Sequence, residues 1–380
     1  MSENEDVHNA VMIDLGSGWT KVGTVGADNP SSVFPTVIGR VNKGRLQSIP
    51  TLMMDRETIG DEAVCRSYNS LTYPIRHGII KDYDLIEKVL HHCFFNELRV
   101  APEEKSVILS TRTLTPKVQR EKLTQILFET FSTLAFFLAQ SSVLSMFASG
   151  RNTGIVLDCG DGVTSVETVC DGYQTIHASK RMSLGGCDIH EYLSKLIFLE
   201  RGVELTTSSE LYTVQKIKEK LSYVALDFDQ ECQTAASSIA LEKSYELPDG
   251  SVMTIGQERF QCMEAFFQPS MVGREDAGIH EMVFNAIQKC DLGVRANFYG
   301  NILLSGGSTC CEGFQERLTK EMQNLAPETM RVKVVAPPER KYSAWIGGSI
   351  LGSLTSMAQF YISREEYDEN GPAIVHRKCY

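Results

Sequence analysis

The sequence predicts an α/β protein in which two duplicated domains face each other across a central cleft. One observation is a strand-like run that enters a glycine loop at residues 154–164, GIVLDCGDGVT. Another is a second copy at residues 11–20, VMIDLGSGWT, which lies 144 residues earlier when Asp14 is aligned with Asp158. A repeat of that length is too long for a solenoid unit, and 380 residues suffice for two or more domains.

The two glycine loops carry the same residue types at the same spacing. The matching pairs are Asp14 with Asp158, Gly16 with Gly160, Gly18 with Gly162, and Thr20 with Thr164. Two glycines that flank one residue let the backbone turn and aim N–H groups into a concavity that suits phosphate oxygens. A carboxylate at the end of the strand suits a hydrated cation. One such loop is typical of an ordinary turn, but two predict a polyphosphate held from both sides with a metal between the aspartates.

Composition restricts the class of protein. The chain is 42% hydrophobic and 22% charged, as is ordinary for soluble globular proteins. Its net charge of −11 argues against general nucleic-acid binding and suits basic protein partners. The stretch MSENEDVHNA is unlike a signal peptide, and no apolar run approaches the about 18 residues of a membrane helix. Eleven cysteines without a C-x-x-C pair favour buried thiols in a reducing cytosol or nucleus over zinc or disulfides.

The first half begins with loops and continues with a helix and a strand. Residues 41–58 have no clear period and expose apolar side chains, so they predict a long, mobile loop that either carries contacts or is an ordinary insertion. Residues 82–98 predict a helix that begins at Asp82 or Asp84. Residues 106–109 predict a short buried strand.

Two further helices are expected before the second glycine loop. The first follows Thr115 as a hydroxyl N-cap, with Pro116 in its first turn. The second covers residues 134–147, an apolar run with small residues that predicts a buried linking helix. Its polar interruption, Gln140 to Ser142, is expected near the cleft.

Glycines also mark the second half. A pair at residues 185–186 precedes Asp188, which is expected to cap a helix that Gly202 ends. Residues 210–226 predict a helix on which Lys218 and Glu219 are either solvated charges or neighbours of a nucleotide base. Three more elements follow: a hairpin turn at 247–250, a strand into glycines at 301–308, and a helix after a double proline within 336–351.

With these stretches in view, the chain resembles the actin family over nearly its whole length. The most specific segments are NELRVAPEE at 96–104, ASGRNTGIVLDCGDGVT at 148–164, KEKLSYVALDF at 218–228, LEKSYELPDG at 241–250, FQPSMVGREDAGIH at 267–280, APPERKYSAWIGGSI at 336–350 and IVHRKCY at 374–380. The resemblance implies an α/β fold of two duplicated actin-like ATPase (ribonuclease H-like) domains around a central nucleotide cleft. The first domain would span 1–148 plus 342–380, with the loop 41–58 in its small subdomain, and the second would span 149–341.

The resemblance also assigns site residues, with ATP or ADP and Mg²⁺ or Ca²⁺ as ligands. The phosphates would be held by Gly16, Ser17, Gly18, Trp19 and Lys21 from one domain and by Gly160, Asp161, Gly162 and Val163 from the other. The metal would be held through water by Asp14 and Asp158. The ribose and adenine would be surrounded by Gly186, Lys218, Glu219, Gly307, Ser308 and Lys341.

Several positions depart from the actin pattern. The glutamine that orients the attacking water falls on Ser141, while Gln140 lies one residue early, about 100° around a helix. The histidine after G-V-T is Ser165, and two arginines of the nucleotide pocket are replaced by Cys187 and Gln215. Slow ATP hydrolysis is therefore expected, with Asp158 beside these catalytic positions. The loop 41–58 is longer and lacks H-Q-G-V-M-V-G-M.

Three functions are compatible with the resemblance. The favoured one is a divergent actin that assembles with itself into filaments, binds actin-binding proteins and belongs to the cytoplasmic cytoskeleton. The alternative is a non-polymerising actin-related protein, a subunit of a chromatin-remodelling or motor-adaptor complex, for which the nucleus is a second compartment. A sugar kinase of the wider superfamily is the third. In each case we expect no direct nucleic-acid contact and no membrane insertion.

Overall fold

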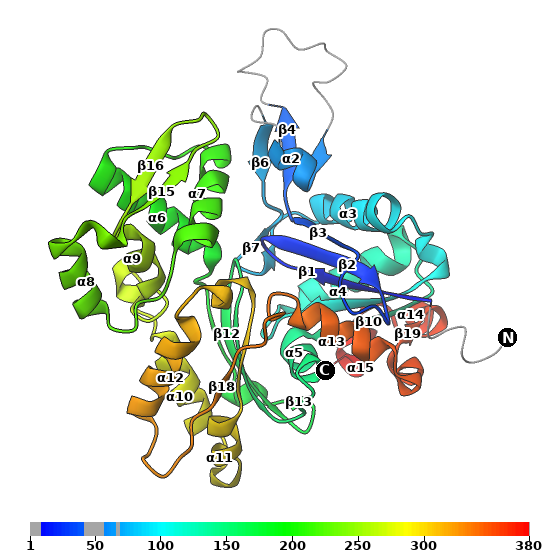
Figure 1. Cartoon of the computed structure of the whole chain (residues 1–380). Coiled ribbons are helices and arrows are strands. Elements are labelled where there is room, and N and C mark those ends of the chain that lie inside the picture. Colours follow the sequence, from blue (N-terminus) through cyan, green and yellow to red (C-terminus); the bar gives the residue numbers. More distant parts are fainter. Residues whose placement is uncertain (1–8, 42–56, 66–68, 380) are drawn as a thin grey trace.

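The computed structural model describes residues 9–41, 57–65 and 69–379, and two mixed sheets organise it (Figure 1). The first sheet has the strand order β19-β10-β9-β1-β2-β3: Ile362–Ser363, Ala135–Gln140, Ser106–Thr111, Ala10–Leu15, Trp19–Thr24 and Ser32–Pro35. The second has the order β13-β12-β11-β17-β18, with β14 beside β12: Tyr173–Gln174, Thr164–Cys170, Gly154–Cys159, Ile302–Ser305, Val334–Val335 and Lys180–Met182.

The pairing pattern of the first sheet recurs in the second. Strands β1 and β2 form an antiparallel hairpin, and β1 runs parallel to β9, which runs parallel to β10. In the same way β11 and β12 form an antiparallel hairpin, and β11 runs parallel to β17, which runs parallel to β18. The 144-residue repeat therefore corresponds to one strand–loop–strand unit used twice, with a glycine loop at the same end of each hairpin.

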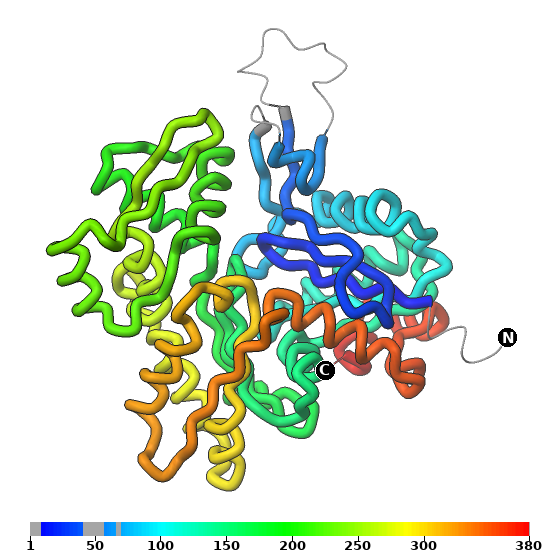
Figure 2. The backbone as a smooth tube through the Cα atoms, viewed as in Figure 1, coloured from blue at the N-terminus to red at the C-terminus, as the bar shows by residue number. Residues whose placement is uncertain are grey.

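Helices and the C-terminal segment cover the first sheet. The main helices are α3 (Tyr83–His91), which a π-helix at His92–Leu98 extends, and α4 (Lys117–Gln125), which a π-helix at Ile126–Thr130 extends. Asp82, one of the two residues that the sequence offered for the start of this helix, caps α3 by accepting a hydrogen bond from Leu85 N at 3.1 Å. The last helices, α14 (Arg364–Asn370) and α15 (Val375–Lys378), return to this sheet, where β19 pairs with β10 (Figure 2).

A small set of strands rises from the edge of the first sheet. It contains β4 (Ile38–Val41), β5 (Thr58–Ile59) and β6 (Asn69–Thr72) with α2 (Asp61–Cys65), and the hairpin of β7 (Ile75–Arg76) and β8 (Ile79–Ile80). Residues 42–56 of the predicted loop lie outside the described residues. No helix of the described ranges is both long and apolar enough to cross a membrane.

Seven helices accompany the second sheet: α6 (Gly186–Arg201), α7 (Ser208–Leu221), α8 (Phe228–Ser237), α9 (Glu258–Glu264), α10 (Ile279–Gln288), α11 (Leu292–Gly300) and α12 (Phe314–Leu325). The expected turn at 247–250 joins the hairpin of β15 (Lys243–Glu246) and β16 (Val252–Ile255). A buried ion pair joins α9 to α12, with Arg317 Nη2 at 2.9 Å from Glu264 Oε1.

Two helices cross between the sheets, α5 (Ser141–Ala148) and α13 (Ser343–Gly352) (Figure 1). They meet at Gly347, where a Cβ would lie 1.7 Å from the backbone oxygen of Leu144, so only glycine permits this approach. Trp345 is fully buried and donates from Nε1 to Met12 O at 3.0 Å, which fixes α13 on β1. The crossing thus joins α13 to both α5 and the first sheet.

Three sequence predictions of element type or boundary are wrong. Residues 135–140 are the strand β10 and not part of a helix, because the apolar run pairs in parallel with β9 and helix α5 begins only at Ser141. Thr115 does not cap α4; its hydroxyl donates to Arg112 O, and Pro116 holds the N-cap position. Helix α7 ends at Leu221, well before residue 226.

Candidate functional site

The two glycine loops face each other at the carboxyl ends of β1 and β11. A Cβ on Gly18 would lie 2.7 Å from Asp161 Cβ, and a Cβ on Gly162 would lie 2.6 Å from Ser17 Oγ. Each loop therefore needs its glycine because the other loop approaches so closely. This reciprocal contact brings together the two copies that the sequence repeat predicted.

The backbone of each loop closes in the same way. Gly16 N donates to Trp19 O at 3.2 Å, and Gly160 N donates to Val163 O at 2.9 Å, which is the same bond 144 residues later. Within the described ranges, no protein acceptor is recorded for the N–H groups of the loop tips, Ser17, Gly18, Asp161 and Gly162. Such N–H groups are donors for phosphate oxygens.

Asp14, at the end of β1, is tied to two neighbours. Its Oδ2 accepts from Lys21 Nζ at 2.5 Å and its Oδ1 from Ser110 Oγ at 2.5 Å. Burial would raise the pKa of Asp14, but the charge and hydrogen bond of Lys21, the hydrogen bond of Ser110 and the charge of Arg112 outweigh it and lower that pKa. The carboxyl is thus held ionised.

Asp158, at the end of β11, has one oxygen paired and one unpaired. Its Oδ2 accepts from Arg112 Nη1 at 2.7 Å, while Oδ1 is buried without a hydrogen-bond partner in the described part of the protein. A carboxyl group with a buried, unpaired oxygen fits a water-bound Mg²⁺ or Ca²⁺, which prefers oxygen ligands. Asp14 and Asp158 are therefore chemically suited to the predicted metal.

Arg112 belongs to the site, and the sequence analysis missed it. It lines the cavity between the two glycine loops and α7, called the main cavity below. A Cβ on Gly160 would lie 2.8 Å from its Nη2. Burial would lower the pKa of Arg112, but the carboxylates of Asp158, Asp14 and Glu167 outweigh it and raise that pKa. The available signal was a basic residue directly after the buried strand β9, which neighbours β1 in the sheet.

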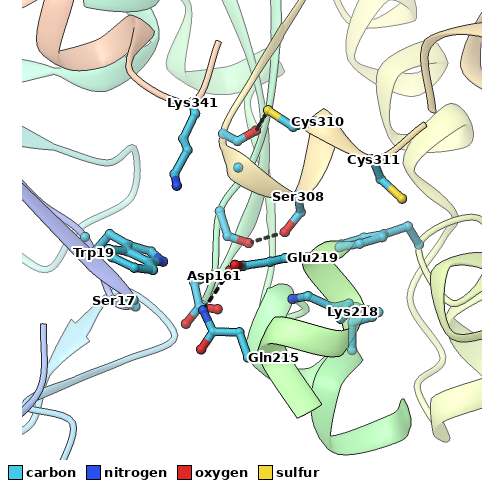
Figure 3. A pocket seen from close by; sticks show the side chains of 18 of the residues that line it. Ser17, Trp19, Asp161, Gln215, Lys218, Glu219, Ser308, Cys310, Cys311 and Lys341 are labelled. Atoms are coloured by element: carbon cyan, nitrogen blue, oxygen red, sulfur yellow. Dashed lines mark hydrogen bonds between the residues drawn. The ribbon is translucent and has the colours of Figure 1, made fainter. Parts of the chain in front are cut away.

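The cavity opens beyond the loops toward α7 and the segment after β17 (Figure 3). Lys218 Nζ donates to Gly186 O at 2.8 Å, and Ser308 Oγ donates to Gly160 O at 3.1 Å. Gln215, one of the departures noted in the sequence, donates to Glu219 Oε1 at 3.0 Å. These bonds hold polar side chains around one wall of the cavity.

Trp19 forms part of the opposite wall (Figure 3). Lys341 Nζ lies 4.9 Å from the centre of a Trp19 ring, and Lys216 Nζ lies 5.0 Å from it. Both lysines come from segments outside the first sheet. Both nitrogens lie within cation–π distance of the ring, so this part of the wall carries positive charge that suits an anionic ligand.

Most of the predicted binding residues line this cavity. They are Gly16, Ser17, Gly18, Trp19, Lys21, Gly160, Asp161, Gly162, Lys218, Glu219, Gly307, Ser308 and Lys341. Asp14 instead lines a smaller adjoining cavity that shares Gly16, Ser17 and Arg112 with the main one. Val163 and Gly186 do not line the cavity. Val163 is buried, and the carbonyl oxygen of Gly186 accepts the hydrogen bond from Lys218 Nζ.

The predicted catalytic residues Gln140, Ser141 and Ser165 do not line either cavity. Gln140 ends β10, and its Oε1 is buried with no partner among the described residues. The same holds for the hydroxyl of Ser141, the first residue of α5. Ser165 faces Asp158 across the β11–β12 pair and donates to Glu167 Oε1 at 2.8 Å. Its hydroxyl is thus already engaged with a buried acid.

A possible metal cluster near the loops is already satisfied by protein partners. Ligand atoms of His77, Cys187 and Asp188 lie within 4.8 Å of one another. Asp188 accepts from Gly185 N at 2.8 Å and Arg274 Nη2 at 2.9 Å, and His77 Nδ1 lies 2.9 Å from Gly162 O. Burial and the charges of nearby carboxylates raise the pKa of Cys187, which keeps it a thiol. The cluster therefore links the β7–β8 turn to α6.

The model of the family described as Actin matches residues 5–380. That match covers nearly the whole chain, both glycine loops and every residue of the two cavities.

Proposed function

The chain belongs to the actin family, with the actin-like ATPase fold, and from that premise we propose that it is a divergent actin. It binds ATP or ADP together with Mg²⁺ or Ca²⁺ in the main cavity and assembles into filaments with itself and actin-binding proteins. The observation that supports this most directly is the pair of opposed loops. Among the described residues, the N–H groups at the loop tips have no recorded hydrogen-bond acceptor, so they are available to phosphate oxygens. We place it in the cytoplasmic cytoskeleton.

The proposed binding mode follows from the positions of the loop backbone and of the side chains around the cavity. The four tip N–H groups and Lys21 hold the phosphates from both sides, and Asp14 and Asp158 hold the cation through water. Lys218, Glu219 and Ser308 border the ribose and base on the far wall. The domain boundaries we propose, 1–148 plus 342–380 and 149–341, divide the chain at the α5–α13 crossing.

Hydrolysis is proposed to be slow. An attacking water must be held in line with the terminal phosphate and must lose a proton. Ser141 has a shorter side chain than glutamine, Gln140 lies at a strand end outside the cavity wall, and Ser165 donates to Glu167. Losses of position of this kind cost on the order of 100-fold in rate.

Single-turnover phosphate release tests the slow chemistry. The chain, Ser141→Gln and Gln140→Ala are compared with a conventional actin under the same conditions. We expect the unmodified chain to be about 100-fold slower than the conventional actin, Ser141→Gln to be faster, and Gln140→Ala to be unchanged. Actin-like rates in the unmodified chain would contradict the proposal, and a collapse in Gln140→Ala would identify that glutamine as the catalytic substitute.

Assembly is tested by sedimentation in polymerising salt with Mg²⁺ and ATP. Pelleting above a critical concentration, with filaments visible by electron microscopy, is the expected result. A chain that binds ATP yet stays in the supernatant would support the other function, a non-polymerising subunit of a chromatin-remodelling or motor-adaptor complex. The two outcomes separate assembly from nucleotide binding.

A further inference from the structure

We propose that Arg112 is a phosphate ligand of this site, a resident cation that contacts the terminal phosphate of a bound nucleoside triphosphate. It takes over part of the charge that a divalent cation otherwise supplies, so that triphosphate binding survives removal of that cation. The inference rests on the proposed function in one respect: it assumes that the cavity binds ATP.

The position of Arg112 supports this role first. Arg112 follows β9 and lines both the main cavity and the adjoining cavity that contains Asp14. Its Nη1 lies 2.7 Å from Asp158 Oδ2, and its Nη2 lies close to Gly160 of the second glycine loop. The guanidinium is therefore placed between the carboxylates that end β1 and β11, beside the loop whose N–H groups face the phosphates.

The hydrogen-bonding capacity of Arg112 is mostly unused. A guanidinium carries five N–H donors, and in the described ranges the only recorded acceptor for this one is Asp158 Oδ2. About a quarter of the side chain is exposed and Arg112 lines both cavities, so donors that Asp158 does not use are available to a ligand there. A planar fork of this kind matches the oxygens of a phosphate group, which it can contact at two points.

The charge around Arg112 explains why the cation becomes less necessary. The two carboxylates of Asp14 and Asp158 are already opposed by Lys21 and Arg112, at 2.5 Å and 2.7 Å. A divalent cation thus enters a neutral group of side chains and gains less attraction than it would beside two unpaired carboxylates. Two protein cations remain next to the incoming triphosphate.

The backbone that carries Arg112 is fixed. Thr115 Oγ1 donates to Arg112 O at 2.7 Å at the entry to α4, and the next residue, Thr113, is buried and contacts Gln174 of the second sheet. Because this turn is already anchored, its backbone loses little conformational entropy when Arg112 binds a ligand.

The test measures nucleotide affinity with and without the divalent cation. ATP and ADP are titrated calorimetrically into the full chain in Mg²⁺ and in EDTA, for the unmodified protein, Arg112→Ala and Arg112→Gln. Arg331→Ala, which removes an exposed arginine outside both cavities, is the matched control. Melting temperatures without nucleotide report folding of each variant, and Arg112→Gln, which keeps much of the side-chain volume, serves if the alanine variant does not fold.

We expect EDTA to weaken ATP binding by less than about 10-fold in the unmodified protein and in the control. In EDTA, loss of the charged hydrogen bonds in either Arg112 variant should weaken ATP binding by about 10–100-fold relative to the unmodified protein. ADP, which lacks the terminal phosphate, should lose less. Equal sensitivity to EDTA with and without Arg112, or equal losses for ATP and ADP, overturns the inference. Failure of the unmodified protein to bind ATP even in Mg²⁺ would instead overturn the proposed function.

Discussion

His190 lies on α6 beside the site, and its imidazole is held neutral there. Burial, with a smaller contribution from the charge of Lys218, lowers the pKa of His190 to about 3, although its hydrogen bond with Gly186 acts in the opposite direction. The unfolded chain binds this proton below about pH 6.5, whereas the folded protein does not until about pH 3. The neutral histidine therefore costs stability progressively as the pH falls from 6.5 toward 3.

The resulting prediction compares the free energy of unfolding at pH 7 and pH 5. His190 alone should lower it by about 2 kcal/mol over this interval. His190→Gln, which cannot titrate but keeps a hydrogen-bonding side chain, should show a correspondingly smaller fall. Urea unfolding at the two pH values measures both, and an identical fall in the variant would contradict the account.

Single residues also show which parts of the site a sequence can reveal. Gly18 and Gly162 could be predicted because a repeated pattern exposes positions that close loop contact keeps as glycine. Arg112 could not, because its importance depends on the adjacency of β9 to β1 and on a loop that comes from the other sheet. The basic residue after β9 marks a candidate position, but neither of these two contacts can be read from the local sequence.

Among the elements, the crossing of α5 and α13 depends on one glycine. Gly347→Ala would place a Cβ 1.7 Å from Leu144 O, so the helices would have to separate. We expect a loss of about 3 kcal/mol in the free energy of unfolding, at the upper end of what overpacked cores usually show. The matched control is Gly293→Ala in α11, where a Cβ meets nothing within 4 Å and the helix should gain about 0.5–1 kcal/mol.

Thermal melting of the two variants measures the contrast. A Gly347→Ala protein as stable as the unmodified chain would mean that the helices can move apart at little cost. Loss of stability in Gly293→Ala would mean that alanine is poorly tolerated for some reason other than steric contact. The difference between the two variants thus isolates the close approach.

The same region explains an error of element type. Residues 135–139 read AFFLA, an apolar run whose length and composition allow either a buried helix or a buried strand. The position of this segment in the sheet makes it a strand, because β10 lies between β9 and β19 and its backbone groups need partners on both sides. By contrast, Asp82 predicted the start of α3 because a cap acts within one turn.

At the scale of the molecule, several contacts between the two halves lie at the cavity proposed to bind nucleotide. Arg112 reaches Asp158, and His77 Nδ1 lies 2.9 Å from Gly162 O. Lys216 Nζ and Lys341 Nζ lie 5.0 Å and 4.9 Å from the centre of a Trp19 ring. A ligand held by both loops binds only when both halves are folded and closed, so it should couple their unfolding.

This coupling predicts the calorimetric behaviour of the whole chain. Without nucleotide, the heat-absorption peak should be broad or split, since the halves can unfold separately. With Mg²⁺–ATP at 100 times its Kd, binding adds about 2.7 kcal/mol, which raises the Tm of a chain of this size by about 3 °C and sharpens the peak.

Gly162→Ala provides the matched variant for that experiment, because its Cβ would lie 2.6 Å from Ser17 Oγ and push the loops apart. It should melt near the unliganded protein and show little response to ATP, since the phosphate N–H groups no longer converge. A nucleotide-induced shift as large as that of the unmodified chain would mean that ATP does not bridge the loops. An unliganded peak as sharp as the liganded one would mean that the α5–α13 crossing alone couples the halves.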